Sequence, residues 1–320
     1  WFEPEMVSPD SELYRSHPDW CLHVPDRRRT EGRMQLILDF SRQDVREAVY
    51  EMLAQVLRNA PIAYVKWDMN RNMTEIGSDL LPPERQRETA HRYMLGLYEV
   101  LEQITAEFPH ILFESCSGGG GRFDPGMLHY MPQTWTSDNS DAVSRLKIQY
   151  GTSIVYPLVT MGAHVSAVPN HQVDRMTSLA MRGDVAMFGS FGYELDLTKF
   201  SEQEKVQVAE LNEGYKDIRG LIQFGDLYRL SSPFEGNEMA WMVVAEDQSE
   251  AVVGYYQILA EPNPPLARLR LKGLNADYDY ELGAGGDVYD GALLMHAGVP
   301  LPMLHGDFQS RMWKLRRVFR

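Results

Sequence analysis

The segment Ile62-Ala63-Tyr64-Val65-Lys66-Trp67-Asp68 decides the predicted fold, because it is a short apolar strand that ends on a carboxylate. Pro61 separates this strand from a helical pattern upstream, and a second helical pattern from Pro82 to Phe108 follows it. The next apolar strand is Ile111–Glu114. Short apolar strands that alternate with helices indicate a parallel sheet that is covered on both faces.

The alternation of strands and helices continues to about residue 225. In the first helix we expect Ser41 to be the N-cap and Asp44 to complete a capping box. Its expected apolar stripe consists of Val45, Val49, Met52, Leu53, Val56 and Leu57. Further along we expect a strand at 153–160, a helix at 172–182, a strand at 185–191 and a helix that begins with a capping box of Ser201 and Glu204.

The pattern changes near residue 224. The runs 239–245, 251–258, 266–271 and 278–282 are short, are rich in β-branched or aromatic residues, and are separated by Gly and Asn-Pro-Pro turns. Such runs are typical of antiparallel strands. We therefore expect two parts, an α/β part over residues 1–225 and a small antiparallel β domain over residues 226–320.

Composition excludes several classes of protein. The net charge is −14, which argues against nucleic-acid binding because that function requires a basic surface. There is no run of 18 apolar residues, so we expect no membrane span. The two cysteines, Cys21 and Cys116, favour a reducing compartment, and we expect a cytoplasmic protein. His164 and His171 lack the nearby carboxylates of a metal site, so we expect no metal and no other cofactor.

Two motifs bring a carboxylate next to an indole ring: Lys66-Trp67-Asp68-Met69-Asn70-Arg71 and Trp135-Thr136-Ser137-Asp138. A pair of carboxylates is the equipment for cleaving a glycosidic bond. Asp68 and Asp138 are 70 residues apart, which corresponds to two units of a (β/α)8 barrel at roughly 30 to 35 residues each. Alternate strands of such a barrel direct side chains into the same layer, so the two carboxylates are expected to face each other.

The alternative for each aspartate is that it only caps the helix that follows. Around Asp68, the polar side chains of Lys66, Asn70 and Arg71 favour a binding site, and we expect the cations to keep the carboxylate ionised. In the second motif, Asp141 is the better candidate for a helix cap and Asp138 for a proton donor.

The loop Ser115-Cys116-Ser117-Gly118-Gly119-Gly120-Gly121-Arg122 resembles a phosphate loop only in its glycines, because it lacks the Gly-Lys-Ser/Thr ending. A nucleophilic Cys116 is disfavoured, because no histidine forms a recognisable motif with it. Glycines allow backbone amides to approach a ligand closely. The alternative is a tight turn after a strand.

Taken together, these motifs resemble the α-galactosidases of glycoside hydrolase family 36. The likeness rests on Trp1-Phe2-Glu3-Pro4-Glu5-Met6-Val7, 38–46, 66–72, 114–124, 135–141 and 275–302. It implies a (β/α)8 TIM barrel followed by a small antiparallel β-sandwich domain. It also implies that Asp68 is the nucleophile and Asp138 the acid/base. The galactose pocket would then be lined by Trp1, Arg33, Lys66, Asn70, Cys116, Gly119 and Trp135, with Cys116 and Gly119 at the sugar's 2-hydroxyl.

The implied activity is that of a retaining exo-α-galactosidase acting on melibiose or raffinose-type oligosaccharides. The alternatives are a galactosyltransferase that uses the same covalent intermediate and a catalytically inactive sugar-binding fragment. Family members also carry an N-terminal β domain and the first barrel strands, and this chain begins without Met on what resembles the end of a buried strand. We therefore expect a C-terminal fragment that is inactive alone because its barrel cannot close, from a protein that forms a homo-oligomer, a dimer or a tetramer.

Overall fold

Strand β3 (Tyr64–Asp68) forms where the sequence predicts it and organises the first of two compact units, Trp1–Asp138 and Asn139–Arg320. The computed structural model describes residues 1–283 and 286–319. In the first unit β3 pairs in parallel with β4 (Leu112–Cys116), and β4 pairs in parallel with β5 (Gln133–Trp135). The register places Asp68 opposite Cys116 and Glu114 opposite Gln133, so the carboxyl ends of the three strands lie at one edge.

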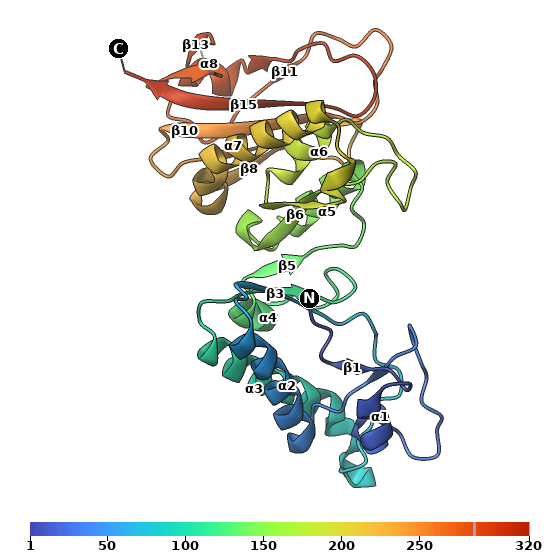
Figure 1. The fold of residues 1–320 in the computed structure, drawn as a ribbon. Helices are drawn as coiled ribbons and strands as arrows, with labels where there is room; N and C mark the ends of the chain where they lie inside the picture. Colours follow the sequence, from blue (N-terminus) through green and yellow to red (C-terminus); the bar gives the residue numbers. More distant parts are fainter. Residues whose placement is uncertain (284–285, 320) are drawn as a thin grey trace. The chain divides into compact units, whose positions relative to one another are not determined.

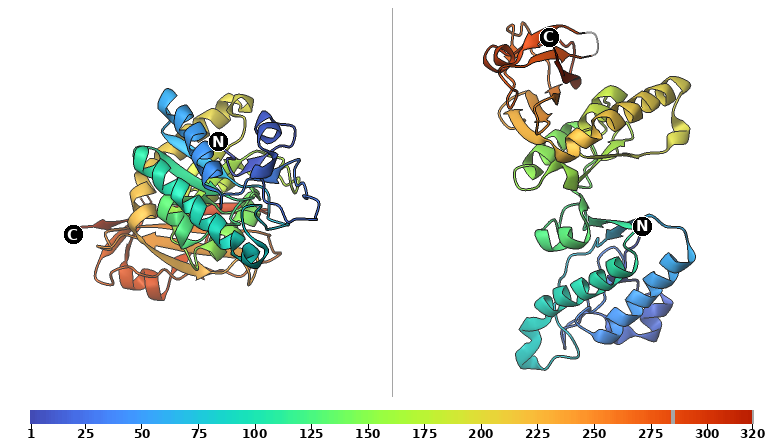
Figure 2. Two further views of the ribbon diagram at one scale, coloured as in Figure 1. Left: turned by 90° about the horizontal axis from the view of Figure 1, so that it is seen from below. Right: turned by 90° about the vertical axis from the view of Figure 1, so that its left-hand side faces the viewer.

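The remaining elements of the first unit are short except for two helices. They are β1 (Met6–Val7), α1 (Glu12–Ser16), η1 (Pro18–Trp20), β2 (Leu36–Ile37), α2 (Gln43–Asn59), η2 (Pro83–Glu88), α3 (Thr89–Glu107) and α4 (Pro125–Tyr130). Helices α2 and α3 lie side by side (Figure 1 and Figure 2, right). Strands β1 and β2 form an antiparallel pair.

Helix α2 corrects two expectations. Its N-cap is Arg42, not Ser41; the Ser41 hydroxyl donates instead to Asp39 at 2.5 Å, and Arg42 forms an ion pair with Asp44. The expected stripe is only partly buried, because Met52 and Val56 are nearly half exposed. The buried face is narrower and consists of Val45, Val49, Leu53, Ala54 and Leu57.

The N-terminal segment lies beside β3, as Figure 1 shows. The Phe2 amide donates to the Lys66 carbonyl and the Asp68 amide donates to the Phe2 carbonyl, each at 2.9 Å. Phe2 therefore pairs with Trp67 in parallel, and the segment acts as a short additional strand on that edge of β3.

The second unit begins with two α-helices, two short 3-10 helices, two parallel strands and a long helix. They are α5 (Ala142–Thr152), η3 (Leu158–Thr160), β6 (Met161–Ser166), α6 (Leu179–Ala186), β7 (Ser190–Glu194), η4 (Leu197–Lys199) and α7 (Glu202–Phe224). Strands β6 and β7 are paired in parallel. The predicted capping box of α7 is confirmed, because Ser201 and Glu204 bond each other's backbone amides.

Three predicted elements in this region are wrong. Residues 153–160 form turns and a 3-10 helix, the helix expected at 172–182 begins only at Leu179, and the strand expected at 185–191 is replaced by the end of α6 and the start of β7. The strand at 185–191 was predicted from the short apolar run 185–188, and a run of that length cannot be assigned to a helix or a strand from its periodicity.

An antiparallel sheet of six strands follows, in the order β13-β12-β15-β10-β9-β8. Its strands are β8 (Asp226–Ser231), β9 (Glu238–Val244), β10 (Glu250–Gln257), β12 (Asp279–Leu282), β13 (Val288–Asp290) and β15 (Gln309–Val318). The C-terminal part also contains a separate antiparallel pair, β11 (Arg268–Leu269) and β14 (Val299–Pro300), and helix α8 (Gly291–His296). Helix α7 contacts β9 and β10 (Figure 2, right).

Parallel strands followed by an antiparallel sheet confirm the α/β class and the antiparallel character of the C-terminal part. The closed barrel and the sandwich stay predictions. Strand β15 was not among the predicted strands. In the described part of the chain, no helix has both the length and the apolar character needed to cross a membrane.

Candidate functional site

Asp68 is held by fixed donors on both of its carboxylate oxygens. Oδ1 accepts the Met69 backbone amide at 2.9 Å, and Oδ2 accepts Asn70 Nδ2 at 2.6 Å. The side chain is almost fully buried at the carboxyl end of β3. A carboxylate with a fixed orientation at the end of a parallel strand is suited to attack a bound substrate from one direction.

Glu3 completes the arrangement around Asn70, and the sequence interpretation did not assign it a role. Its Oε1 accepts the same Asn70 Nδ2 at 2.7 Å, and its Oε2 accepts Gln35 Nε2 at 3.1 Å. Arg33 Nη1 lies 3.7 Å from Glu3 Oε1. The predicted residues Arg33, Asn70 and Asp68 are therefore connected through a carboxylate that is far from β3 in the sequence.

Lys66 lies between two predicted aromatic residues. Its Nζ is 4.6 Å from the ring centroid of Trp1 and 5.0 Å from that of Trp135. Trp135 is buried and Trp1 is exposed. The structure thus brings Trp1, Lys66 and Trp135 together on the face of the sheet that also carries Asp68.

Arg71 was expected to lie beside Asp68 and keep its carboxylate ionised, but its hydrogen bonds are made elsewhere. Its guanidinium donates to the backbone carbonyls of Thr30, Gln35 and Asn72, and it is buried there. Arg71 therefore fixes the loop around residues 30–35, and Asp68 receives neutral donors in its place. The proximity of residues in sequence was misleading because the chain turns away after Asn70.

The glycine-rich loop joins the two carboxylate segments. Ser117 Oγ donates to the Met69 carbonyl at 2.9 Å. Gly119 has φ +82°, and a Cβ at this position would lie 2.7 Å from Ser137 Cα and 2.9 Å from Asp138 N. The loop is also a tight turn, because the Ser117 amide donates to the Gly119 carbonyl at 2.8 Å. The absence of a Cβ at Gly119 thus allows the backbone to approach the Asp138 segment.

Cys116 is buried at the start of this loop. Burial raises the pKa of its thiol to about 12, and the Asp68 carboxylate adds to the rise. The thiol is therefore protonated at neutral pH, which makes it a poor nucleophile. Cys116 and Cys21 are both free and buried.

Asp138 follows β5 by three residues, at the same edge of the sheet as Asp68. Its side chain is exposed. Asp141 has the capping role predicted for it, because its side chain accepts the Ser144 amide at 2.8 Å and begins α5. All nine residues predicted for the site belong to the first unit.

Glu5 forms a buried network that sequence reasoning missed. It accepts Trp67 Nε1 at 2.8 Å, Tyr93 Oη at 2.5 Å and both terminal nitrogens of Arg122 at 2.8 Å. Burial alone would raise the pKa of Glu5, but the Arg122 guanidinium and the three donors outweigh it and lower the pKa. The network fixes β3, α3 and the end of the glycine-rich loop to one carboxylate.

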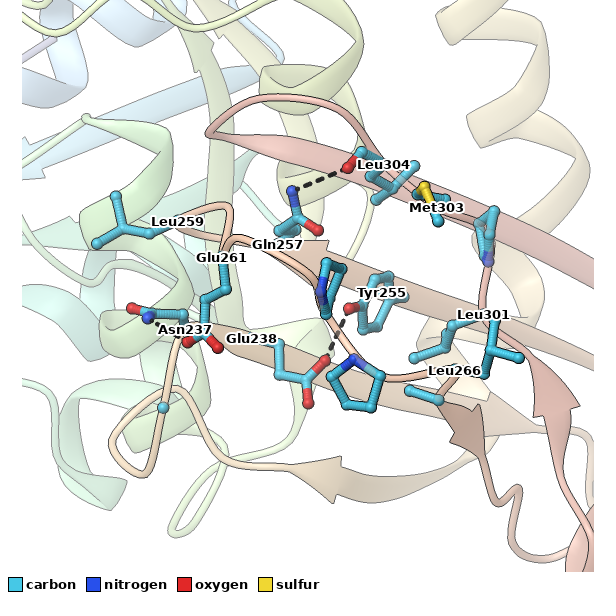
Figure 3. A pocket seen from close by; sticks show the side chains of 15 residues that line it. Asn237, Glu238, Tyr255, Gln257, Leu259, Glu261, Leu266, Leu301, Met303 and Leu304 are labelled. Atoms are coloured by element: carbon cyan, nitrogen blue, oxygen red, sulfur yellow. Dashed lines mark hydrogen bonds between the residues drawn. The ribbon is translucent and has the colours of Figure 1, made fainter.

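A pocket of about 360 Å³ lies in the antiparallel part and contains none of the predicted residues (Figure 3). Its carboxylates are already bonded, Glu238 to Tyr255 Oη at 2.7 Å and Glu261 to Asn237 at 3.0 Å. Among residues 1–283 and 286–319, no group of three or more His, Cys, Asp or Glu side chains is arranged to hold a metal ion.

Comparison with known proteins agrees with this geometry. The melibiase family matches residues 1–225, and the glycosyl hydrolase family 36 C-terminal domain matches residues 238–315. Alpha-galactosidase AgaA of Geobacillus stearothermophilus is 68% identical over 99% of this chain, and alpha-galactosidase 1 of Pediococcus pentosaceus is 49% identical over 99%. The chain spans 44% and 43% of the lengths of these two proteins.

Solved structures give the same result. A variant of AgaA in complex with raffinose has a TM-score of 0.98, with 99% of this chain and 44% of that chain covered. The alpha-galactosidase of Lactobacillus brevis, at 46% identity, also has a TM-score of 0.98, with 100% of this chain and 44% of that chain covered. The chain therefore belongs to glycoside hydrolase family 36, with the melibiase segment at residues 1–225 and the family's C-terminal domain at residues 238–315.

Proposed function

We propose that the protein containing this chain is a retaining exo-α-galactosidase that hydrolyses terminal α-galactosides such as melibiose and raffinose-type oligosaccharides. The observation that carries this proposal is the placement of Asp68 and Asp138 after two strands of one parallel sheet, joined by the loop that contains Cys116 and Gly119. The AgaA structures with raffinose and with stachyose support the choice of substrate class.

In this proposal Asp68 attacks the anomeric carbon while Asp138 protonates the departing glycosidic oxygen. Asp138 then removes a proton from water, which attacks the same carbon and releases galactose. Asp68 is suited to the first role because the Met69 amide and Asn70 orient both of its oxygens.

The other predicted residues would bind the sugar. Trp1 and Trp135 offer ring faces and Lys66 offers three N–H donors to hydroxyl groups. Arg33 and Asn70 are oriented by Glu3. Cys116 and Gly119 would lie at the 2-hydroxyl.

The proposed nucleophile is tested with Asp68→Gly and Asp68→Asn in the full-length protein, assayed with 4-nitrophenyl α-galactoside. We expect both variants to lose turnover by about 10⁴-fold or more, because no covalent intermediate can form. Azide should restore activity to Asp68→Gly and yield β-galactosyl azide. Substantial hydrolysis by Asp68→Asn without azide would remove Asp68 from this role.

Retention is tested by following the first product by NMR. Retaining enzymes hold their carboxyl groups about 5 to 5.5 Å apart and inverting enzymes about 6.5 to 9.5 Å. We expect α-galactose to form first and β-galactose to appear only by mutarotation. β-Galactose as the first product would mean that Asp68 activates water rather than attacking the sugar.

The same experiments separate the alternatives. A galactosyltransferase would move galactose from raffinose to a second sugar more often than to water, which product analysis detects. A sugar-binding protein without activity would bind galactose with no turnover. The names of the relatives, all α-galactosidases in whole or in part, favour hydrolysis.

We also propose that the chain consists of a partial barrel over residues 1–225 and a β-sandwich domain over residues 226–320, that the protein is cytoplasmic, and that it forms a dimer or tetramer. The end of α7 at Phe224 supports the boundary, and two buried free cysteines fit a reducing compartment. Light scattering on the full-length protein measures the oligomeric state.

A further inference from the structure

Glu114 is a buried carboxylate that the proposed chemistry does not use. It lies on β4 with only 2% of its side chain exposed. Its Oε2 accepts the Tyr64 hydroxyl, and that hydroxyl in turn accepts Gln133 Nε2 at 3.0 Å. Its Oε1 is buried and accepts no hydrogen bond from the described residues. That unsatisfied oxygen lies 3.7 Å from Lys66 Nζ.

The sheet register explains why these groups meet. Lys66 is the direct neighbour of Glu114, and Asp68 is the direct neighbour of Cys116, two residues further along the same strands. Because alternate residues of a strand share a face, all four side chains project from one side of the sheet. Glu114 is therefore one layer below the Asp68 carboxylate.

A buried carboxylate is strongly unfavourable unless it is paired and hydrogen-bonded. Tyr64 satisfies one oxygen of Glu114, and the Lys66 ammonium is the charge that faces the other. Among the described residues, Glu114 is the one carboxylate within 4.0 Å of Lys66 Nζ. The ammonium also lies over the ring faces of Trp1 and Trp135, which attract a cation but accept no strong hydrogen bond.

The length of the contact also matters. At 3.7 Å the ion pair is longer than a hydrogen bond, so it attracts the ammonium without using its N–H donors. These donors are available for the hydroxyl groups of a sugar that lies over Asp68. A shorter, hydrogen-bonded pair would direct one of them toward the sheet.

We propose that Glu114 is a positioning residue that holds the Lys66 ammonium between Trp1 and Trp135, so that its donors face the sugar. This inference rests on the proposed function, because it assigns Glu114 a part in binding the same substrate. Glu114 touches no substrate atom itself and acts through Lys66.

The test is a double-mutant cycle in the full-length protein with Glu114→Gln, Lys66→Met and the double variant, assayed by kcat and KM on 4-nitrophenyl α-galactoside. Glu114→Gln keeps the shape and an acceptor for Tyr64 but removes the charge. We expect kcat/KM to fall by about 10- to 100-fold, because a misplaced Lys66 would lose a hydrogen bond to a sugar hydroxyl, and a hydrogen bond that involves a charged group is worth about that factor. The loss should arise mainly in KM, because Lys66 would contact hydroxyls that do not change during the reaction.

The decisive comparison is the effect of Glu114→Gln when Lys66 is already Met. If Glu114 acts through Lys66, the second substitution should change kcat/KM by less than about twofold. Equal losses with Lys and with Met at position 66 would overturn the proposal and leave Glu114 a purely structural residue. Galactose affinity, measured by calorimetry on the same four proteins, should show the same pattern and applies even if Lys66→Met is too slow to assay.

Tyr64→Phe is the matched control. It removes the hydrogen bond to the other oxygen of Glu114 but leaves the carboxylate facing Lys66, so we expect a lower unfolding temperature with kcat/KM within about threefold of the parent. If Glu114→Gln does not fold, Glu114→Asp replaces it in the cycle, with the same non-additivity expected. An inactive parent protein would contradict the proposed function, whereas an active parent with an unaffected Glu114→Gln would contradict only this inference.

Discussion

The substitution Gly119→Ala should separate catalysis from folding, because its Cβ would meet the backbone of the segment that carries Asp138. The Cβ would lie 2.7 Å from Ser137 Cα and 2.9 Å from Asp138 N, whereas ordinary contact begins at 3.4 Å. Both atoms belong to the backbone, so no flexible side chain can move aside. The segment must retreat by about 0.7 Å, the difference between 3.4 and 2.7 Å.

A displacement of that size is large for Asp138 in its proposed role as the acid/base. A misplacement of about 1 Å costs roughly 100-fold in rate, so we expect kcat to fall by about 30- to 100-fold. The positive φ of +82° adds a backbone cost of about 1 to 3 kcal/mol. This second effect lowers stability and should appear as a fall of several degrees in the unfolding temperature.

Gly118→Ala is the matched control, because Gly118 also has a positive φ, +55°, but nothing lies within 4 Å of its Cβ position. We expect it to lose about 1 kcal/mol of stability and to keep its kcat within about twofold. The assay is kcat on 4-nitrophenyl α-galactoside, with thermal unfolding of each protein measured in parallel. A folded Gly119→Ala protein with parental kcat, or an equal loss of kcat in both variants, would refute the reasoning.

Two further predictions concern stability and its dependence on pH. Glu5→Gln leaves Arg122 buried without its partner, so urea unfolding at pH 7 should show a loss of about 3 to 5 kcal/mol. The pKa of Glu5 is lower in the folded protein than its ordinary value of 4.5, so Glu5 stabilises the fold above pH 4.5 and this stabilisation fades as the pH falls. The free energies of unfolding of the parent and the variant should therefore converge in acid. A difference that stays constant with pH would contradict this. Burial raises the pKa of Asp184 to about 6, only partly opposed by Ser310 and Arg311, so the folded parent loses stability as the pH rises from about 4 to 6. Asp184→Asn should therefore be more stable than the parent by up to about 3 kcal/mol above pH 6 and equal to it near pH 4, as unfolding at both pH values would measure.

Local patterns allowed correct prediction where the physical cause is local. Strands β3 and β4 are short apolar runs between helices, and the capping box of α7 depends on two residues three positions apart. Asp141 was correctly predicted as a helix cap for the same reason. The placement of Asp68 at the end of β3 followed from the strand itself.

Sequence patterns failed where the cause is distant in the chain. Glu5 bonds Trp67 and Arg122 from 62 and 117 residues away, and Glu3 bonds Asn70 from 67 residues away. No periodicity connects such positions, so the network around the site could not be predicted. The cationic neighbours expected for Asp68 were inferred from adjacency, and Arg71 shows that the chain direction after a strand overrides adjacency.

The pairing of Phe2 with β3 has a consequence for enzyme engineering. A designer who transplants residues 64–70 into another protein would transfer the proposed nucleophile Asp68 and Asn70 but not the Glu3 carboxylate, which accepts a hydrogen bond from the same Asn70 amide. The edge of β3 would also lose its backbone partner. The transferable module therefore consists of two separate pieces of chain, residues 1–5 and 64–70, which have to be moved together.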